Sequence, residues 1–141
     1  MRPALLFVFL SALSASSVMA EVDPAANATV LTTVRIDTPV LAGGAPLPAG
    51  AYEIRLTGQR PTAPAGEPQN AEEWVEFVAD GKIVAREAAE IIDDNDLPTE
   101  GASSRTVHSG TRVEMLKGGE FLRISVKRDH QRYLIYLPIK K

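Results

Sequence analysis

The sequence predicts an all-β protein, a single antiparallel β-sandwich that ends in a three-stranded meander. Apolar and polar residues alternate over short runs, and clusters of Gly, Pro, Asn and Asp separate these runs. Hardly any segment repeats its apolar residues with the helical period. The chain has no cysteine, so a hydrophobic core must supply the stability that disulfides give many small exported domains. Residues 21–141 are long enough to form one such domain.

Residues 1–20 have the pattern of a secretory signal peptide that is cleaved on export. Arg2 supplies the positive start, and the apolar run from Ala4 to Ala15 is too short and too rich in serine to span a bilayer. A small residue, Ala20, stands at the expected cleavage point. We therefore expect a periplasmic or secreted protein with no transmembrane segment in the mature chain. The alternative for these residues is a buried first helix.

Charge is uneven along the expected mature chain. Between Glu21 and Ser104 there are 5 Lys/Arg against 15 Asp/Glu, whereas Arg105 to Lys141 holds 9 against 3. In one compact domain this asymmetry indicates acidic and basic strands lying side by side, and the alternative is a basic end that binds a polyanion. The net charge of −4 that remains after removal of the leader argues against nucleic acid as a partner.

Two strands and a turn are expected in the first third of the mature chain. The first strand would place Val30, Thr32, Val34 and Ile36 on one face, with Leu31, Thr33, Arg35 and Asp37 opposite. The second would bury Tyr52, Ile54 and Leu56. Between the two strands, Pro48 fixes φ for the first corner of a type I turn, and Gly50 is placed to follow it. Residues 57–71, rich in Pro, Gly and polar side chains, are expected to form a surface loop.

Residues 72–92 are predicted to form a hairpin around Asp80-Gly81, a dipeptide that favours a type I′ turn. A two-residue loop there predicts two facing pairs, Val78 with Ile83 and Phe77 with Val84. Either face of this hairpin could lie against the core, because both faces are partly apolar. A helix over residues 85–92 is the second interpretation.

The C-terminal third predicts a meander whose register is set by two turns. A turn at Gly118-Gly119 places Glu114 opposite Arg123 as a solvent-side ion pair, and a turn over residues 128–131 places Val126 opposite Tyr133. Both turns give the same inward set: Val113, Met115, Leu122, Ile124, Val126, Tyr133, Ile135 and Leu137. Because a slip of one residue would invert every face, the agreement of the two turns supports this register.

The segment Leu47-Pro48-Ala49-Gly50-Ala51-Tyr52, which follows Gly43-Gly44, resembles a recurrent hairpin of small exported bacterial β-sandwich proteins. In those proteins an L-P-A-G-x-Y motif leads into a core strand. They include families of unknown function and, with L-P-P-G-x-Y, transthyretin-like or carboxypeptidase-regulatory-like domains. The resemblance implies a β-sandwich outside the cytoplasm, usually without known catalysis. It implies no functional residue, because the motif itself is structural.

The sequence favours a protein that is not an enzyme. Its two histidines are His108 and His130. His130 lies at a predicted hairpin tip, and the side chain of Ser109 would point away from that of His108 on a strand. The G-x-S-x-G and H-E-x-x-H motifs are absent. The alternative is a small periplasmic enzyme or cation-dependent module that uses His108 and the acidic loop 93–100.

We expect no cofactor, and a calcium ion held by this acidic loop is the alternative. The candidate ligands are Asp93, Asp94, Asp96 and Glu100. The EF-hand spacing is not met, so a solvated loop without metal is the first interpretation.

Two further groups are candidates for binding an unknown protein or envelope component. Trp74 and Tyr136 could stack on sugar rings or on an apolar partner, or simply pack at strand edges. Lys127, Arg128 and Arg132, close to His130, could meet anionic envelope polymers or lipid headgroups. Such a basic tip can also protect a sheet edge from aggregation. We expect a binding or cell-envelope accessory domain whose working surface lies on the loops 57–71, 93–100 and 127–132.

Overall fold

The computed structural model describes residues 28–67, 70–93 and 110–141, and every regular element within them is a β-strand. The strands are β1 (Thr29–Ile36), β2 (Val40–Ala42), β3 (Ala45–Leu47), β4 (Gly50–Leu56), β5 (Glu72–Ala79), β6 (Lys82–Asp93), β7 (Thr111–Met115), β8 (Phe121–Arg128) and β9 (Gln131–Pro138). The predicted all-β, antiparallel class is therefore confirmed. The expected signal peptide lies outside the described residues.

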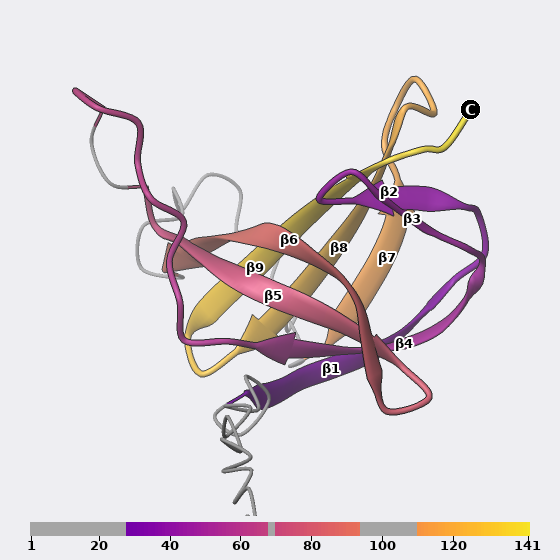
Figure 1. The fold of residues 1–141 in the computed structure, drawn as a ribbon, viewed down its shortest axis with the longest axis horizontal. Coiled ribbons are helices and arrows are strands. Elements are labelled where there is room, and N and C mark those ends of the chain that lie inside the picture. The colour runs from indigo at the N-terminus through magenta and orange to yellow at the C-terminus, as the bar shows by residue number, and fades with distance from the viewer. Residues whose placement is uncertain (1–27, 68–69, 94–109) are drawn as a thin grey trace, which may run out of the picture.

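Seven of these strands form one antiparallel sheet in the order β1-β4-β5-β6-β9-β8-β7, and β2 pairs with β3 separately. The long strand β6 joins the two halves of the sheet, because it pairs with β5 along residues 82–90 and with β9 along residues 89–93. The sheet curls about β6, so that β1 passes close to β7 (Figure 1). A hydrogen bond between the hydroxyls of Thr32 and Thr111 links these two edge strands.

The curled sheet encloses a hydrophobic core on its inner face. The largest fully buried side chains are Ile36, Val40, Leu47, Ile54, Val75, Phe77, Ile124, Ile135 and Leu137. The hairpin β2–β3 covers one end of this core. It is attached there by a bridge between Val40 and Ile139 and by a hydrogen bond of 2.7 Å from Gly43 N to the Glu87 carboxylate. The opposite end, where β8 turns into β9, carries no such cover from the described strands (Figure 1).

The register predicted for the C-terminal meander is confirmed. Residues within the paired strands face one another as predicted, including Glu114 with Arg123 and Val126 with Tyr133. The first loop has four residues rather than two, since Leu116 N donates to Phe121 O at 2.9 Å. Lengthening the loop by one residue on each side leaves the register unchanged. Met115 was expected in the core, but 47% of its surface is exposed because β7 is an edge strand.

The strict alternation predicted for the first strand holds only in its second half. A register shift between Val30 and Thr32 breaks the alternation. Leu31 enters the core and Val30 is 47% exposed, whereas Val34 and Ile36, which share a face as predicted, are buried. The bulge was not expected, because Val30 and Leu31 are both apolar and either could face inward.

The hairpin around Asp80-Gly81 forms a type I′ turn, with φ of 52° and 75° at its two central residues. Val78 faces Ile83 as predicted. The expected pair of Phe77 with Val84 is wrong, since a bulge places Ala85 opposite Phe77. The core side of the hairpin, left open by the sequence, is given by the buried residues Val75, Phe77, Ala85 and Ala89. A strand, not the alternative helix, occupies residues 85–92.

Candidate functional site

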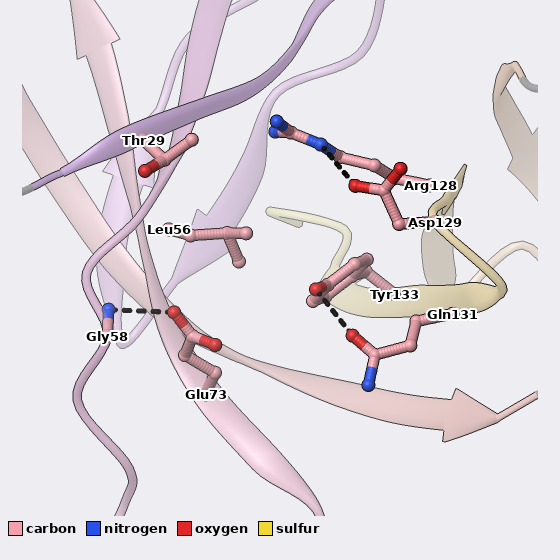
Figure 2. A pocket seen from close by; sticks show the side chains of 8 residues that line it. All are labelled: Thr29, Leu56, Gly58, Glu73, Arg128, Asp129, Gln131 and Tyr133. Carbon is pink, nitrogen blue, oxygen red and sulfur yellow. Dashed lines mark hydrogen bonds and ion pairs between the residues drawn. The ribbon is translucent and has the colours of Figure 1, made fainter.

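A pocket of about 280 Å³ opens at the uncovered end of the curled sheet, beside the turn between β8 and β9 (Figure 2). Its walls come from segments that are distant in the sequence: the starts of β1 and β5, the end of β4 with the residues after it, and the β8–β9 turn. The lining residues are Thr29, Leu56, Gly58, Glu73, Arg128, Asp129, Gln131 and Tyr133.

Strand alternation explains why three of these side chains point into the pocket. Leu56 continues the inward set of β4, and Tyr133 that of β9. Glu73 lies two residues before the buried Val75, so its side chain emerges on the same face of β5. The pocket therefore lies at the open end of the core. There the last inward-facing side chains, Leu56, Glu73 and Tyr133, are in contact with solvent, and Glu73 brings a carboxylate.

The β8–β9 turn fixes the opposite wall. Asp129 and His130 have φ of 49° and 66°, the positive values of a type I′ turn. Arg128 holds this turn against β1, because its Nη1 donates to the Val30 carbonyl at 2.9 Å. Its Nε donates to Asp129 Oδ2 at 3.3 Å. The pocket wall thus has a fixed position relative to the first strand.

Two further hydrogen bonds orient the polar side chains of the pocket. Gly58 N donates to Glu73 Oε1 at 2.7 Å, and Tyr133 Oη donates to Gln131 Oε1 at 3.0 Å (Figure 2). Burial raises the pKa of Tyr133, and the Glu73 carboxylate acts in the same direction. The phenol is therefore neutral at neutral pH, and the pocket's charge comes from Glu73, Arg128 and Asp129.

The basic tip predicted from the sequence is only partly directed at the pocket. Arg128 lines it, whereas Lys127 faces Arg132 across the β8–β9 pair on the outer face of the sheet. His130 is exposed at the turn itself. Sequence reasoning missed Glu73 and Tyr133 as pocket residues. The alternation of inward and outward residues along β5 and β9 indicates that both side chains face inward. It shows that they line the same pocket only when the strand order is also known.

Trp74 and Tyr136 both lie on the outer face, two strands apart. Trp74 pairs with Ala88 on β6, and the next residue, Ala89, pairs with Ile135 on β9. Ala88 therefore separates the two aromatic side chains. Tyr136 is 37% exposed and faces Arg123 on β8. The two residues share a face, but they do not contact each other in a common aromatic cluster.

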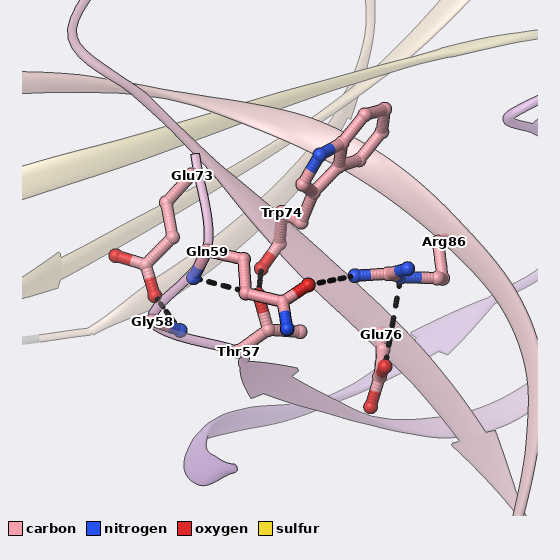
Figure 3. A network of polar contacts seen from close by, with 7 residues as sticks. All are labelled: Thr57, Gly58, Gln59, Glu73, Trp74, Glu76 and Arg86. Carbon is pink, nitrogen blue, oxygen red and sulfur yellow. Dashed lines mark hydrogen bonds and ion pairs between the residues drawn. The ribbon is translucent and has the colours of Figure 1, made fainter. Parts of the chain in front are cut away.

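Trp74 is held by a polar network on that outer face (Figure 3). Its backbone N donates to Gln59 O at 2.8 Å, and Thr57 Oγ1 donates to Trp74 O at 2.8 Å. The Arg86 guanidinium lies 5.6 Å from the centroid of the indole and also donates to Gln59 Oε1 at 3.0 Å. The start of the predicted loop 57–71 is thereby fixed to β5, and one face of the indole is covered.

Glu76 lies beneath this network and was not singled out by the sequence. Its side chain is 4% exposed, and Arg86 Nε lies 3.5 Å from its Oε1. Glu76 Oε2 is buried without a hydrogen-bond partner. Among the described residues it is the one charged side chain that is buried. The network therefore contains a carboxylate whose desolvation is only partly compensated.

The candidate calcium ligands are only partly visible. Asp93 ends β6 opposite Gln131, whereas Asp94, Asp96, Glu100 and His108 lie outside the described residues. Within residues 28–67, 70–93 and 110–141, no three metal-ligating side chains come together.

Comparison with known proteins finds no family model that matches the chain, and no curated protein or solved structure that is significantly similar to it. In the part of the chain that the structure describes, no helix is long and apolar enough to cross a membrane.

Proposed function

We propose that this chain is an exported, non-enzymatic β-sandwich protein that binds a small polar ligand at the end of its curled sheet, as a binding or cell-envelope accessory domain. The pocket carries the proposal. It combines an apolar wall with a few fixed polar groups, the composition typical of ligand sites. Its volume of about 280 Å³ lies just below the ~300–1,000 Å³ of typical ligand pockets, which favours a small ligand.

Export to the periplasm or the medium is part of this proposal. It is supported by the signal-peptide pattern of residues 1–20 and by the resemblance of residues 47–52 to the hairpin of exported sandwich proteins. A ligand site on such a domain would serve capture of a small molecule or attachment to an envelope component.

A titration followed by amide resonances tests the proposal directly. Small polar compounds of cationic, anionic and neutral classes are added to the purified protein, and the amide shifts are followed. We expect at least one class to give saturable shifts at Gly58 and Gln131, with Gly119 at the far end of β8 as the unperturbed control. Failure of every class to move Gly58 and Gln131 would contradict ligand binding at this pocket.

Thermal melts separate this proposal from a cation-dependent module built on loop 93–100 and His108. Binding of a metal to the folded state alone would raise the melting temperature with metal concentration. Under our proposal, calcium, zinc and EDTA leave the melting temperature unchanged. A rise of several degrees with calcium that EDTA reverses would favour the cation-dependent module instead.

A further inference from the structure

The charged groups around the pocket do not cancel. One guanidinium, Arg128, stands against two carboxylates, Glu73 and Asp129, which leaves a formal charge of −1. Arg128 and Asp129 are neighbours on one turn, with Nε and Oδ2 3.3 Å apart, so they largely neutralise each other. The excess negative charge therefore resides at Glu73. A ligand that complements this pocket should carry a positive charge.

The hydrogen-bonding groups of the pocket also favour a positively charged ligand that donates hydrogen bonds. The N–H of Gly58 is used by Glu73 Oε1, and the hydroxyl hydrogen of Tyr133 is used by Gln131. In Arg128, Nε donates to Asp129 and Nη1 donates to the Val30 carbonyl. Among the described residues, by contrast, Glu73 Oε2 accepts no hydrogen bond. Figure 2 shows this second oxygen on the side of Glu73 that faces Gln131 and Tyr133.

An ammonium group matches this arrangement because it has three donors and no acceptor. A carboxylate ligand would meet the net negative charge, and the charge of the guanidinium is already paired with Asp129. A divalent cation would need more carboxylate oxygens than the described residues bring together here. The remaining wall is apolar, since Leu56 and the ring of Tyr133 line it.

We propose that the pocket binds a primary ammonium group on a short hydrocarbon chain, with Glu73 as its anionic partner and Leu56 and Tyr133 against the chain. The proposal rests on the ligand-binding function proposed above and names the ligand class of the same site. Glu73 Oε2 accepts one ammonium hydrogen while Oε1 keeps its bond to Gly58. Tyr133 Oη, whose own hydrogen points to Gln131, can accept another.

The test compares three probes of equal length: butylammonium, butanol and butyrate. Each is titrated into the protein while the amide resonances of Gly58 and Gln131 are followed. We expect saturable shifts with butylammonium and none with butyrate at the same concentrations. Raising the salt concentration should weaken binding of butylammonium, because an exposed ion pair is screened.

Two variants on the same strand give a matched pair. Glu73→Gln and Glu72→Gln remove the same charge from adjacent positions, but residue 72 points to the outer face, where it pairs with Glu90. Glu73→Gln should weaken butylammonium at least tenfold, and Glu72→Gln should leave the affinity within twofold. The amide oxygen of the Glu73→Gln side chain can still accept from Gly58 N, so the fold should be retained, as a thermal melt would show.

The outcomes separate the ligand class from the pocket itself. If butyrate or butanol moves the pocket amides and butylammonium does not, the ammonium class is wrong and the binding pocket stands. If both glutamate variants weaken butylammonium equally, Glu73 is not its partner. If no compound of any class moves Gly58 and Gln131, the proposed function fails together with its ligand.

Discussion

The hydroxyl of Tyr52 donates a hydrogen bond of 2.6 Å to the carbonyl oxygen of Pro48, four residues upstream. The ring of Tyr52 packs edge-on against Phe77, with centroids 6.3 Å apart. A tyrosine whose hydroxyl returns to the backbone a few residues upstream is a recurrent corner of β-sandwiches. The bond gives the L-P-A-G-A-Y segment a structural role: its last residue, on β4, is tied back to the proline that follows β3.

Replacing Tyr52 with Phe should therefore destabilise the protein while leaving its core packing unchanged. We expect a loss of about 1 kcal/mol in the free energy of unfolding, because one hydrogen bond is removed and the ring remains. Urea denaturation measures the change. Tyr136→Phe, at an exposed position on the outer face, is the matched control and should cost less than about 0.5 kcal/mol. Equal costs for the two variants would contradict a special role for the Tyr52 bond.

The two glycines at the tip of the β2–β3 hairpin should respond differently to alanine. Both have positive φ, 54° at Gly43 and 80° at Gly44, so either substitution strains the backbone by about 1 kcal/mol. A Cβ at residue 43 would also clash with the carbonyl oxygen of Arg86, whereas one at residue 44 meets nothing within 4 Å. We expect Gly43→Ala to cost about 2–4 kcal/mol in total.

Chemical denaturation of both glycine variants checks this difference. The Gly43→Ala cost should exceed that of Gly44→Ala, since the hairpin must move away from β6. If Gly44→Ala were the more costly of the two, the hairpin would not lie against Arg86 as described.

Adjacent substitutions on β8 test the inward face of the meander. Ile124 is fully buried, and Asp at that position would place an unpaired charge in the core, so Ile124→Asp should abolish folding. Arg123 is paired with Glu114 on the outer face, where Nε lies 2.8 Å from Oε1. Arg123→Asp should cost about 0–1 kcal/mol for the lost pair, with mild repulsion from Glu114 added.

Circular dichroism and thermal melts of the two variants read out this contrast. Ile124→Val should cost only about 0.5–1.5 kcal/mol, which would show that the position tolerates a smaller apolar residue. A folded Ile124→Asp protein beside an unfolded Arg123→Asp protein would mean that the strand faces the other way.

Turn chemistry made much of this fold predictable. Asp80-Gly81 and the 128–131 segment set their hairpins locally, and the register of β7, β8 and β9 follows from the positions on which their two turns are centred. The two bulges could not be predicted, because each lies at adjacent apolar residues, Val30-Leu31 and Ile83-Val84, where either side chain satisfies the pattern. Packing in three dimensions decides the outcome: Leu31 enters the core at the first bulge, whereas at the second both Ile83 and Val84 stay exposed and Ala85 enters it.

The candidate site was less predictable than the fold for a physical reason. The sequence drew attention to Arg128 by its basic neighbours, but Glu73 looks like one more acid beside Glu72. What distinguishes Glu73 is that its face of β5 ends opposite Tyr133, a residue sixty positions later in the chain. That proximity depends on the strand order β5-β6-β9, which no local pattern contains. Similarly, Trp74 gave no sign that Arg86 would cover it.

The stability of the protein should fall in strongly basic solution. Burial raises the pKa of both Tyr133 and Tyr52 above the ordinary value near 10. The unfolded chain then ionises at lower pH than the folded protein. The stabilising contribution is fully present below about pH 10 and is lost as pH rises through the folded-state pKa values.

Urea denaturation at several pH values between about 9 and 11 measures this loss around the ordinary tyrosine pKa. The double variant Tyr52→Phe, Tyr133→Phe should show a shallower decline than the natural protein, although it starts from a lower stability. An equally steep decline in the double variant would assign the effect to other groups.

The pair of Glu76 and Arg86 should be asymmetric in its contribution to stability. Glu76 is buried with one unpartnered oxygen, whereas the Arg86 side chain is 44% exposed. Arg86→Met would leave the carboxylate desolvated and without its counter-ion, and we expect a loss of about 1–3 kcal/mol, less than for a fully buried pair. Glu76→Met removes the desolvated charge, and Arg86 can keep Gln59 and solvent as partners, so this variant should be neutral or more stable.

A double-mutant cycle isolates the coupling between the two residues. Residues in one polar network typically couple by about 0.5–3 kcal/mol, so the double variant should be more stable than Arg86→Met alone. Stability is measured by urea denaturation at neutral pH, with Trp74 fluorescence as the probe, because Arg86 lies over the indole. If Glu76→Met proved as destabilising as Arg86→Met, then Glu76 would stabilise the fold through its charge, and its unpartnered oxygen would have to be satisfied by ordered water.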